Sequence, residues 1–293
     1  MDNINGIVVV NKEKGFTSHD VVNVVRRIFG TRKVGHTGTL DPDATGVLPI
    51  CIGKGTKVAD MLTFSDKCYE ARVRLGLTTD TQDISGEILT TADVNISENE
   101  LLEVVKKFTG NIEQIPPMYS AIKIKGQKLC DLARKGVEVE RMPRSITIYS
   151  AEVRDFNGTE FNLAVHCSKG TYIRTLCHDI GAYLGCGAVM TELKRTKSSC
   201  FSLDNSYTLD ELKSMDENAL QAVLSPIDSV FVDYPELKLN DKLKKLFCNG
   251  VKCSIGAKEG TYRVYDKDGV FLAVAQVLER DNKNILKSVK TFY

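Results

Sequence analysis

The segment Val34–Ile50, VGHTGTLDPDATGVLPI, contains three glycines, two prolines and two aspartates. It has neither a helical nor a strand period, so it predicts a loop. Pro42 biases the preceding Asp41 toward an extended backbone. The glycines allow positive φ angles or the close approach of another piece of chain. The segment therefore predicts a tightly shaped loop with Asp41 near its middle.

Asp41 has two interpretations on this basis. An aspartate before a proline is common turn chemistry, in which the carboxylate accepts hydrogen bonds from nearby N–H groups. Alternatively, the loop holds one carboxylate in a fixed place for a reaction, as a nucleophile or a base. That use requires a partner that keeps the carboxylate ionised, and a nearby arginine would do so by lowering its pKa. The loop alone does not say which arginine.

Outside this loop, strand-like and helix-like segments are mixed without a regular strand–helix alternation. This order favours an α+β fold over a doubly wound parallel sheet. The apolar patterns predict strands over 6–10, 69–77, 146–156 and 161–167. Helix-start signals, apolar periods and glycine stops predict helices over 17–30, 56–64, 101–108 and 172–184.

Two segments are basic, although the whole chain has a net charge of only +1. Residues 120–144 contain 7 Lys and Arg against 3 Asp and Glu, and read as a projecting hairpin and helix. Residues 234–293 contain 12 against 7, and Asp268-Gly269 between two strand-like runs predicts a hairpin. We expect a domain over 1–233 and a small, mainly β module over 234–293. Basic patches fit a polyanionic partner, but solvated faces explain the charge equally well.

Composition narrows the class of protein. The start, MDNINGIVVVNKEKG, has no basic region ahead of its short apolar run, so it does not read as a secretory signal. No apolar run approaches the ~20 residues that span a bilayer, so we expect a cytoplasmic protein without a membrane partner. The nine cysteines form no Cys-x-x-Cys pair, which predicts reduced thiols and no metal site.

One motif is a near miss. Gly30–Thr37, GTRKVGHT, almost matches the phosphate-binding pattern G-x-x-x-x-G-K-[ST]. His36 stands where a lysine is needed, and a predicted helix precedes it in place of a strand. Nucleotide binding is therefore a weak alternative.

The segment Gly35–Pro49 closely resembles the signature of the TruB family of tRNA pseudouridine synthases. Further pieces follow in the order of that family, and the resemblance covers most of residues 6–201. These pieces are Ser65–Tyr69 (SDKCY), Leu75-Gly76 with Thr79–Asp83 (TDTQD), Pro116–Ala121 (PPMYSA), Cys167–Thr175 (CSKGTYIRT) and Leu184–Ala188 (LGCGA).

The resemblance implies isomerisation of a uridine, at position 55 in the T-loop of tRNA, to pseudouridine. It implies that Asp41 is the essential carboxylate, acting on the ribose, and that Arg174 pairs with Asp41. Tyr69 would lie against the target uracil and is a candidate for moving its C5 proton. The reaction is redox-neutral, so no cofactor and no metal are expected.

The resemblance also implies substrate-binding residues and partners. His36 would fill the space vacated in the RNA or hold the distorted loop, and Tyr172 and Leu193 would line the uracil pocket. The basic insertion, about 120–145, would grip the T-loop arm of tRNA. The C-terminal module would be a β-barrel-like, PUA-like RNA-binding domain on a pseudouridine synthase fold, a mixed and largely antiparallel sheet flanked by helices.

We expect a monomeric enzyme. A module that binds and remodels tRNA without chemistry is the second hypothesis, and nucleotide binding through Gly30–Thr37 is the third.

Overall fold

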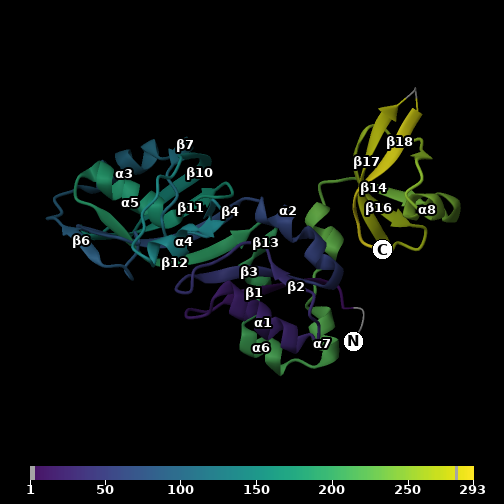
Figure 1. Cartoon of the computed structure of the whole chain (residues 1–293), viewed down its shortest axis with the longest axis horizontal. Helices are drawn as coiled ribbons and strands as arrows, with labels where there is room; N and C mark the ends of the chain where they lie inside the picture. The colour runs from purple at the N-terminus through teal and green to yellow at the C-terminus, as the bar shows by residue number, and fades with distance from the viewer. Residues whose placement is uncertain (1–3, 281–282) are drawn as a thin grey trace.

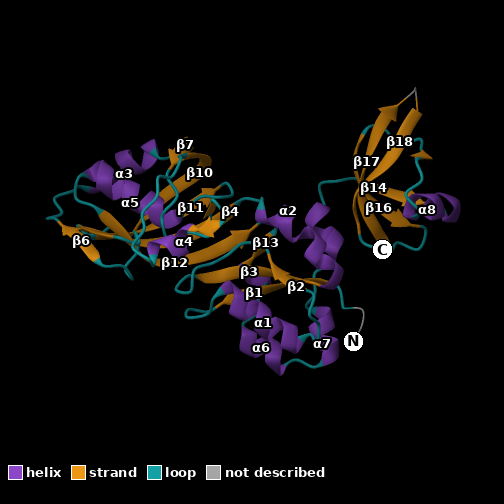
Figure 2. Cartoon of the chain, viewed as in Figure 1, coloured by secondary structure: helices purple, strands orange, loops and turns teal. Residues whose placement is uncertain are grey.

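The computed structural model describes residues 4–280 and 283–293, which form a large sheet and a small sheet with helices around them (Figures 1 and 2). The main path of the large sheet runs β1-β3-β12-β4-β11-β10-β7, with β2 beside β3 and β13 beside β12. In this sheet β3 and β12 are parallel, while the other pairs are antiparallel. Its strands are β1 (Gly6–Lys12), β2 (Val34–His36), β3 (Thr45–Ile52), β4 (Lys67–Leu75), β7 (Gly110–Gln114), β10 (Arg144–Arg154), β11 (Glu160–Cys167), β12 (Ala188–Ser198) and β13 (Phe201–Ser202). The expected α+β class, with a mixed and largely antiparallel sheet, is confirmed.

Three helices lie on the large sheet where the sequence predicts them. Thr17 and Asp20 form a capping box at the start of α1 (Ser18–Ile28), and Ser97 with Glu100 does the same for α3 (Glu98–Lys107). The helix α5 (Ile173–Leu184) ends at Gly185, whose backbone is left-handed. The helix α1 shares an apolar cluster with β1 and β3, whereas α3 and α5 share one with β4, β10 and β11.

The prediction that residues 34–50 form a loop is wrong at both ends. Val34–His36 is β2, and Thr45–Ile52 is β3, a strand inside the sheet. Leu48 and Ile50 enter one apolar cluster while Val47 and Cys51 enter another, so β3 is buried on both faces. A strand buried on both faces is apolar throughout and shows no alternation, which hid it from the pattern analysis.

A proline inside β3 also argued against a strand. Pro49 lies opposite Val9 of β1, and its carbonyl accepts a hydrogen bond from the N–H of Thr37 on the other side. The N and C=O of one strand residue point to the same side, so the nitrogen of Pro49 also points away from β1. Because Pro49 has no N–H to donate there, it fits this strand without breaking the β1–β3 ladder.

The basic insertion is a hairpin followed by a short helix, as expected. Strands β8 (Lys123–Ile124) and β9 (Gln127–Lys128) are joined by Lys125 and Gly126, both with positive φ. Positive φ at both central residues is the geometry that matches the twist of a two-residue hairpin. The helix α4 (Leu129–Ala133) comes next. Strands β5 (Leu77–Thr79) and β6 (Ile88–Thr91) form another two-stranded sheet.

The C-terminal strands form the small, curled sheet in the order β14-β16-β17-β18-β15, at the right of Figure 1. The Asp268-Gly269 turn joins β16 to β17, as predicted. This part contains β14 (Glu236–Leu239), α8 (Asp241–Cys248), β15 (Cys253–Ser254), β16 (Gly260–Asp266), β17 (Phe271–Arg280) and β18 (Lys283–Thr291). A domain division at 233 and 234 stays a prediction.

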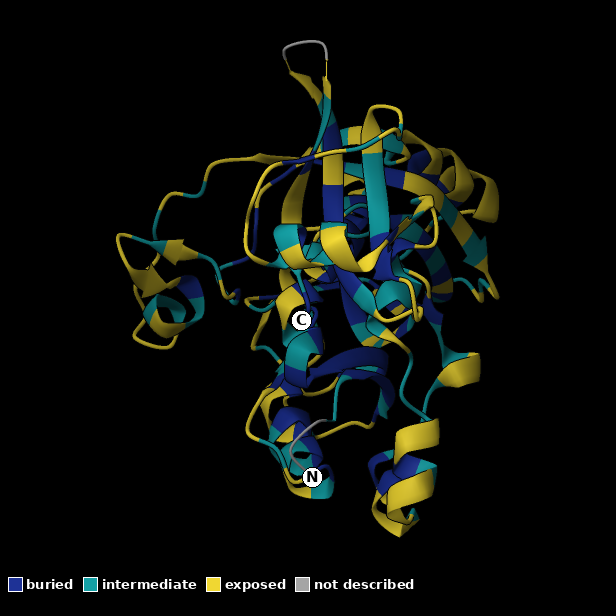
Figure 3. Cartoon of the chain, turned by 90° about the vertical axis from the view of Figure 1, so that its right-hand side faces the viewer, coloured by how far each residue is buried: buried dark blue, intermediate teal, exposed yellow. Residues whose placement is uncertain are grey.

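The two sheets share one apolar cluster. Val274 of β17 and Phe292, which follows β18, join Ile7 and Val9 of β1 in it, and Phe231 belongs to the same cluster. The connecting elements supply further members of this cluster and of the cluster around α1. These elements are η1 (Gly53–Val58), α2 (Ala59–Thr63), η2 (Leu203–Asn205), α6 (Leu209–Ser214), α7 (Glu217–Ala222) and η3 (Ile227–Phe231). Many of the exposed residues lie on loops and hairpin tips (Figure 3). Across the described ranges, no helix is both long and apolar enough to cross a bilayer.

Candidate active site

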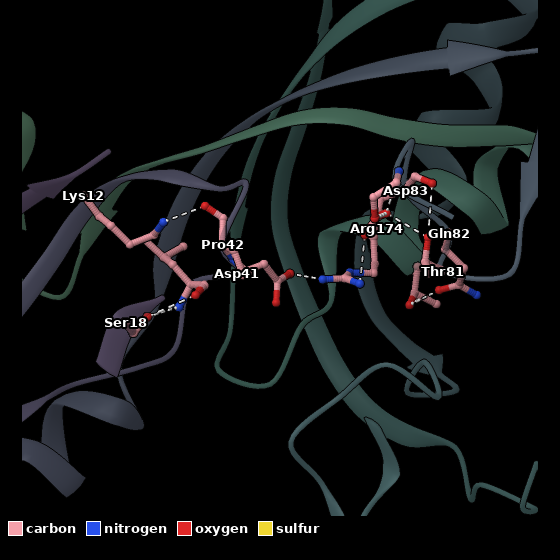
Figure 4. A network of polar contacts seen from close by, with 11 residues as sticks. Lys12, Ser18, Asp41, Pro42, Thr81, Gln82, Asp83 and Arg174 are labelled. Atoms are coloured by element: carbon pink, nitrogen blue, oxygen red, sulfur yellow. Dashed lines mark hydrogen bonds and ion pairs between the residues drawn. The ribbon is translucent and has the colours of Figure 1, made fainter. Parts of the chain in front are cut away.

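Asp41 lies in the turn between β2 and β3, and the backbone on both sides of it is fixed (Figure 4). The N–H of Leu40 donates to the hydroxyl of Ser18 at 2.8 Å, and that hydroxyl lies 3.0 Å from the carbonyl of Leu40. On the other side, the carbonyl of Pro42 accepts a hydrogen bond from the N–H of Gly15 at 2.9 Å. The carboxylate of Asp41 therefore projects from a restrained piece of backbone.

Lys12, at the end of β1, reinforces this restraint. Its side chain is fully buried, and its Nζ donates to the carbonyls of Pro42 at 3.0 Å, Phe16 at 2.6 Å and Glu13 at 3.0 Å. Burial lowers the pKa of Lys12 to about 8, and the charge of Asp43 partly opposes that shift. Lys12 thus ties the end of a strand to the turn that bears Asp41.

The carboxylate of Asp41 forms an ion pair with Arg174, near the start of α5. The side chain of Arg174 is only 9% exposed, whereas that of Asp41 is 46% exposed. The other terminal nitrogen of Arg174 lies 2.9 Å from Asp83. Burial lowers the pKa of Arg174. The arrangement presents a reachable carboxylate in front of a cation that a second carboxylate holds in place.

Asp83 was not among the predicted site residues, although it lies in the TDTQD motif. Its Oδ1 accepts hydrogen bonds from the hydroxyls of Thr81 and Ser85 at 2.8 and 2.5 Å. The preceding Gln82 has a positive φ of 64°, and its side chain accepts a 2.7 Å hydrogen bond from the hydroxyl of Thr175. These contacts attach the turn that bears Asp83 to the same helix that bears Arg174.

Tyr172 precedes that helix, and its backbone is fixed by a buried side chain. The N–H of Tyr172 donates to Oε1 of Gln114 at 2.8 Å, and Nε2 of Gln114 donates to the carbonyl of Tyr172 at 3.1 Å. The side-chain amide of Gln114 thus bonds to both backbone polar groups of Tyr172, as a neighbouring strand would, and holds the residue that directly precedes α5. Burial raises the pKa of Tyr172.

Tyr69 and Leu193 are half-buried and pack against two apolar clusters at once, the one under α1 and the one under α5. They come from the neighbouring strands β4 and β12, where Leu193 lies opposite Ala71. Burial raises the pKa of Tyr69, and the charge of Arg195 opposes that rise. The phenol of Tyr69 is therefore uncharged near neutral pH.

His36 ends β2 and supports the same turn. The N–H of Gly38 donates to Nδ1 of His36 at 3.3 Å, which requires that nitrogen to be unprotonated. Burial lowers the pKa of His36, with the charge of Arg195 as a further cause. The neutral imidazole is thus part of the turn that bears Asp41.

Comparison with known proteins decides the family. Residues 26–173 match the family model described as TruB family pseudouridylate synthase (N terminal domain), and residues 174–232 match the one described as tRNA pseudouridylate synthase B C-terminal domain. A relative named tRNA pseudouridine synthase B, from Clostridium kluyveri, is 44% identical over 99% of this chain and 100% of its own length. One of the same name from Pseudomonas fluorescens is 45% identical over 94% of this chain and 93% of its own. The chain belongs to the TruB family of tRNA pseudouridine synthases.

Solved structures agree with this membership. The TruB-family chain superposes with a TM-score of 0.75 on a chain from a structure titled "Crystal Structure of a Cbf5-Nop10-Gar1 Complex", at 27% identity, over 98% of this chain and 85% of that one. A chain from the archaeal box H/ACA sRNP Nop10-Cbf5 complex, at 24% identity and a TM-score of 0.72, shows the same fold. The class expected from the sequence, a tRNA-modifying isomerase of this family, is confirmed.

The TruB fold brings the predicted residues together to different degrees. Asp41 and Arg174 are in direct contact, as the resemblance implied, and His36 lies in the same turn as Asp41. Tyr172 directly precedes the helix of Arg174. Tyr69 and Leu193 lie where the two clusters meet, and the catalytic or binding roles of all six residues remain predictions.

The near-miss phosphate loop has the wrong surroundings. Gly30–Thr37 follows α1 and runs into β2, so it does not lead directly into the N-terminus of a helix, as a phosphate-binding loop does. Within residues 4–280 and 283–293, no group of three or more His, Cys, Asp and Glu side chains is arranged to hold a metal ion.

Proposed function

We propose that this TruB-family enzyme converts the uridine at position 55, in the T-loop of tRNA, to pseudouridine. The observation that carries the proposal is the half-exposed carboxylate of Asp41, restrained on both sides and paired with the buried Arg174. A carboxylate held in this way reacts from a fixed position, which lowers the entropic part of the barrier. Arg174 keeps it charged and oriented.

The chemistry is an exchange of bonds within one nucleotide. The bond from N1 of uracil to C1′ of ribose breaks and the bond from C5 to C1′ forms. The proton on C5 leaves, and the freed N1 takes up a proton, so the product has the same atoms as the substrate. No electrons are gained or lost. In this proposal Asp41 acts on the sugar at C1′ or C2′, as a nucleophile or a base, and the phenol of Tyr69 moves the C5 proton.

The target uridine must leave its stack before its glycosidic bond can be reached, which costs a few kcal/mol and least in a loop. We assign Tyr172 and Leu193 to the walls around the everted uracil. Tyr69 offers an aromatic face on which the base stacks. His36 fills the space left in the RNA or holds the turn around Asp41.

We assign the grip on the T-loop arm to the basic insertion, about 120–145. The lysines and arginines of residues 234–293, as a PUA-like module, contact phosphates and add affinity without choosing the base. A monomer that works in the cytoplasm without a cofactor completes the proposal.

The test is a tRNA transcript labelled with tritium at C5 of its uridines, because each pseudouridine formed releases one C5 proton. Asp41→Asn should abolish tritium release while the dissociation constant for tRNA stays within about threefold, since the charge but not the shape is lost. Asp43→Asn, an exposed aspartate two residues on, is the matched control and should keep its activity.

A transcript with cytidine at position 55 should release no tritium. Wild-type release from Asp41→Asn would contradict the role of Asp41, and release from the cytidine transcript would contradict the position. A wild-type protein that binds tRNA but releases nothing would favour the binding-module hypothesis.

A further inference from the structure

Arg195 is the largest fully buried side chain of the described residues, with 1% exposure. Among the described residues it forms no ion pair with a carboxylate. Burying a charge costs free energy unless its surroundings compensate for it, so the presence of a buried arginine here calls for an explanation.

The position of Arg195 in the sheet is central. It lies in β12, opposite Tyr69 of β4 on one side and beside Gly46 of β3 on the other. A register shift follows directly, between Arg195 and Lys197. Such irregularities bend a strand and redirect its side chains, and they are frequent beside active sites. Arg195 therefore links the strand of Tyr69 to the strand that follows Asp41.

The guanidinium of Arg195 donates hydrogen bonds to backbone carbonyls at both ends of the turn that bears Asp41. Its Nε donates to the carbonyl of Val47 at 2.7 Å, and a terminal nitrogen donates to the carbonyl of Gly38 at 3.2 Å. These two carbonyls lie on either side of Asp41 in the sequence. One rigid, planar group thus closes the base of the turn, and the geometry of its donors fixes the distance between the two carbonyls.

The backbone around Arg195 is equally close. A Cβ added to Gly46 would lie 2.2 Å from the carbonyl oxygen of Arg195, and Gly46 has a positive φ of 100°. Glycine at this position lets β12 come close enough for its arginine to reach under the turn.

Arg195 and Tyr69 lie directly opposite each other on β12 and β4, so their side chains project side by side from the same face of the sheet. The charge of Arg195 also opposes the rise that burial causes in the pKa of Tyr69. Other groups within reach of its charge are Lys12, His36 and Lys67, whose pKa values it lowers in addition to the effect of burial. Arg195 therefore bonds to the turn of Asp41 and is the cross-strand neighbour of Tyr69, so it adjoins both parts of the proposed machinery.

We infer that Arg195 is a positioning residue for the isomerisation: it bonds to Gly38 and Val47 and lies beside Tyr69, and so holds the turn of Asp41 in a fixed relation to the phenol of Tyr69. It acts through these groups and does not touch the substrate. This inference rests on the proposed function, in which Asp41 and Tyr69 work on one nucleotide. The pieces that carry the family resemblance do not include Arg195, which lies in the segment KRTKSS.

The experiment compares Arg195→Lys and Arg195→Met with the wild-type protein. The Met variant should lower kcat for tRNA by about 100-fold with KM within about threefold, because a misplacement of about 1 Å costs that much without weakening remote binding. The Lys variant keeps the charge but not the planar fork, and should lose about tenfold. Arg72→Lys and Arg72→Met, at a half-exposed arginine of β4, are the controls and should keep wild-type kinetics.

Hydrogen exchange supplies the second readout. Amides of residues 37–47 should exchange at least about tenfold faster in both Arg195 variants, while those of α3 stay unchanged, because only the turn loses its anchor. If the Met variant does not fold, the Lys variant decides by the same two measurements. A folded variant with wild-type kcat and unchanged exchange over 37–47 would overturn the inference. Absence of pseudouridine with the wild-type protein would instead overturn the proposed function.

Discussion

Asp83→Asn removes one of the two carboxylates that pair with Arg174 and leaves Asp41 unchanged, so it tests how far Asp83 supports Arg174. Asp83 and Arg174 are 2.9 Å apart, and both side chains are largely buried. At an effective dielectric constant of about 20, unit charges at that distance attract by about 6 kcal/mol, against which the cost of burying the carboxylate must be set. The asparagine oxygen can keep the hydrogen bonds to Thr81 and Ser85, but then its amide hydrogens face the guanidinium, donor against donor.

We therefore expect Asp83→Asn to lower the free energy of unfolding by about 2–3 kcal/mol, somewhat less than breaking a fully buried ion pair. The melting temperature should fall by about 5–10 °C. Arg174 would keep Asp41 as its one carboxylate partner but lose the contact that orients it. The rate of pseudouridine formation should fall about 10- to 100-fold, an increase in the barrier of about 1.4–2.7 kcal/mol.

The assay is single-turnover tritium release with enzyme in excess, together with thermal unfolding of the free protein. Excess enzyme removes product release from the measured rate, so the loss reports on the bound complex. Glu87→Gln, an exposed change in the same turn, is the matched control and should leave both quantities unchanged. An Asp83→Asn protein with wild-type melting temperature and wild-type rate would show that Asp83 does not support Arg174.

Two further changes test Lys12, which restrains the turn of Asp41, and Asp179, which lies on α5. Lys12→Met removes three hydrogen bonds to carbonyls, each worth about 1 kcal/mol, and leaves Pro42 only its bond from Gly15, so the melting temperature and the single-turnover rate should both fall. An unchanged rate would show that the bond from Lys12 to Pro42 does not hold the turn. Burial raises the pKa of Asp179 to about 6, above its ordinary value, so the folded state binds more protons and its stability falls as pH rises from about 4 to 6. Asp179→Asn should therefore raise the melting temperature at pH 7.5 and raise it less at pH 4.5, and an equal gain at both would contradict the shifted pKa.

The local signals in the sequence predicted much of the fold. The helix-start signals at Thr17 and Ser97, the alternation predicted over 69–77 and the Asp268-Gly269 turn each identified an element, although β4 ends at Leu75 and Leu77 begins β5. These signals depend on interactions between residues a few positions apart, so the sequence alone carries them. The pattern analysis did not identify β3 as a strand, because burial on both faces removes the alternation of apolar and polar residues.

β12 was missed for a different reason. It runs through a charged segment, and its Arg195 is buried because β3 and β4 lie on both sides of it. Nothing near it in the sequence distinguishes this arginine from the exposed Lys194 and Lys197. Burial of a charge is decided by neighbours that are distant along the chain, and a local pattern does not contain them.

By itself, the sequence determined the restrained turn around Asp41 and, through its motifs, the family and the partner Arg174. The tertiary structure alone decided that Asp83 forms a second ion pair with Arg174 and that Arg195 bonds to the carbonyls of Gly38 and Val47, on either side of Asp41. The physical reason is the range of the forces: turns and caps form between near neighbours, whereas an ion pair between residues 41 and 174 exists only once the sheet has brought β3, β12 and α5 together.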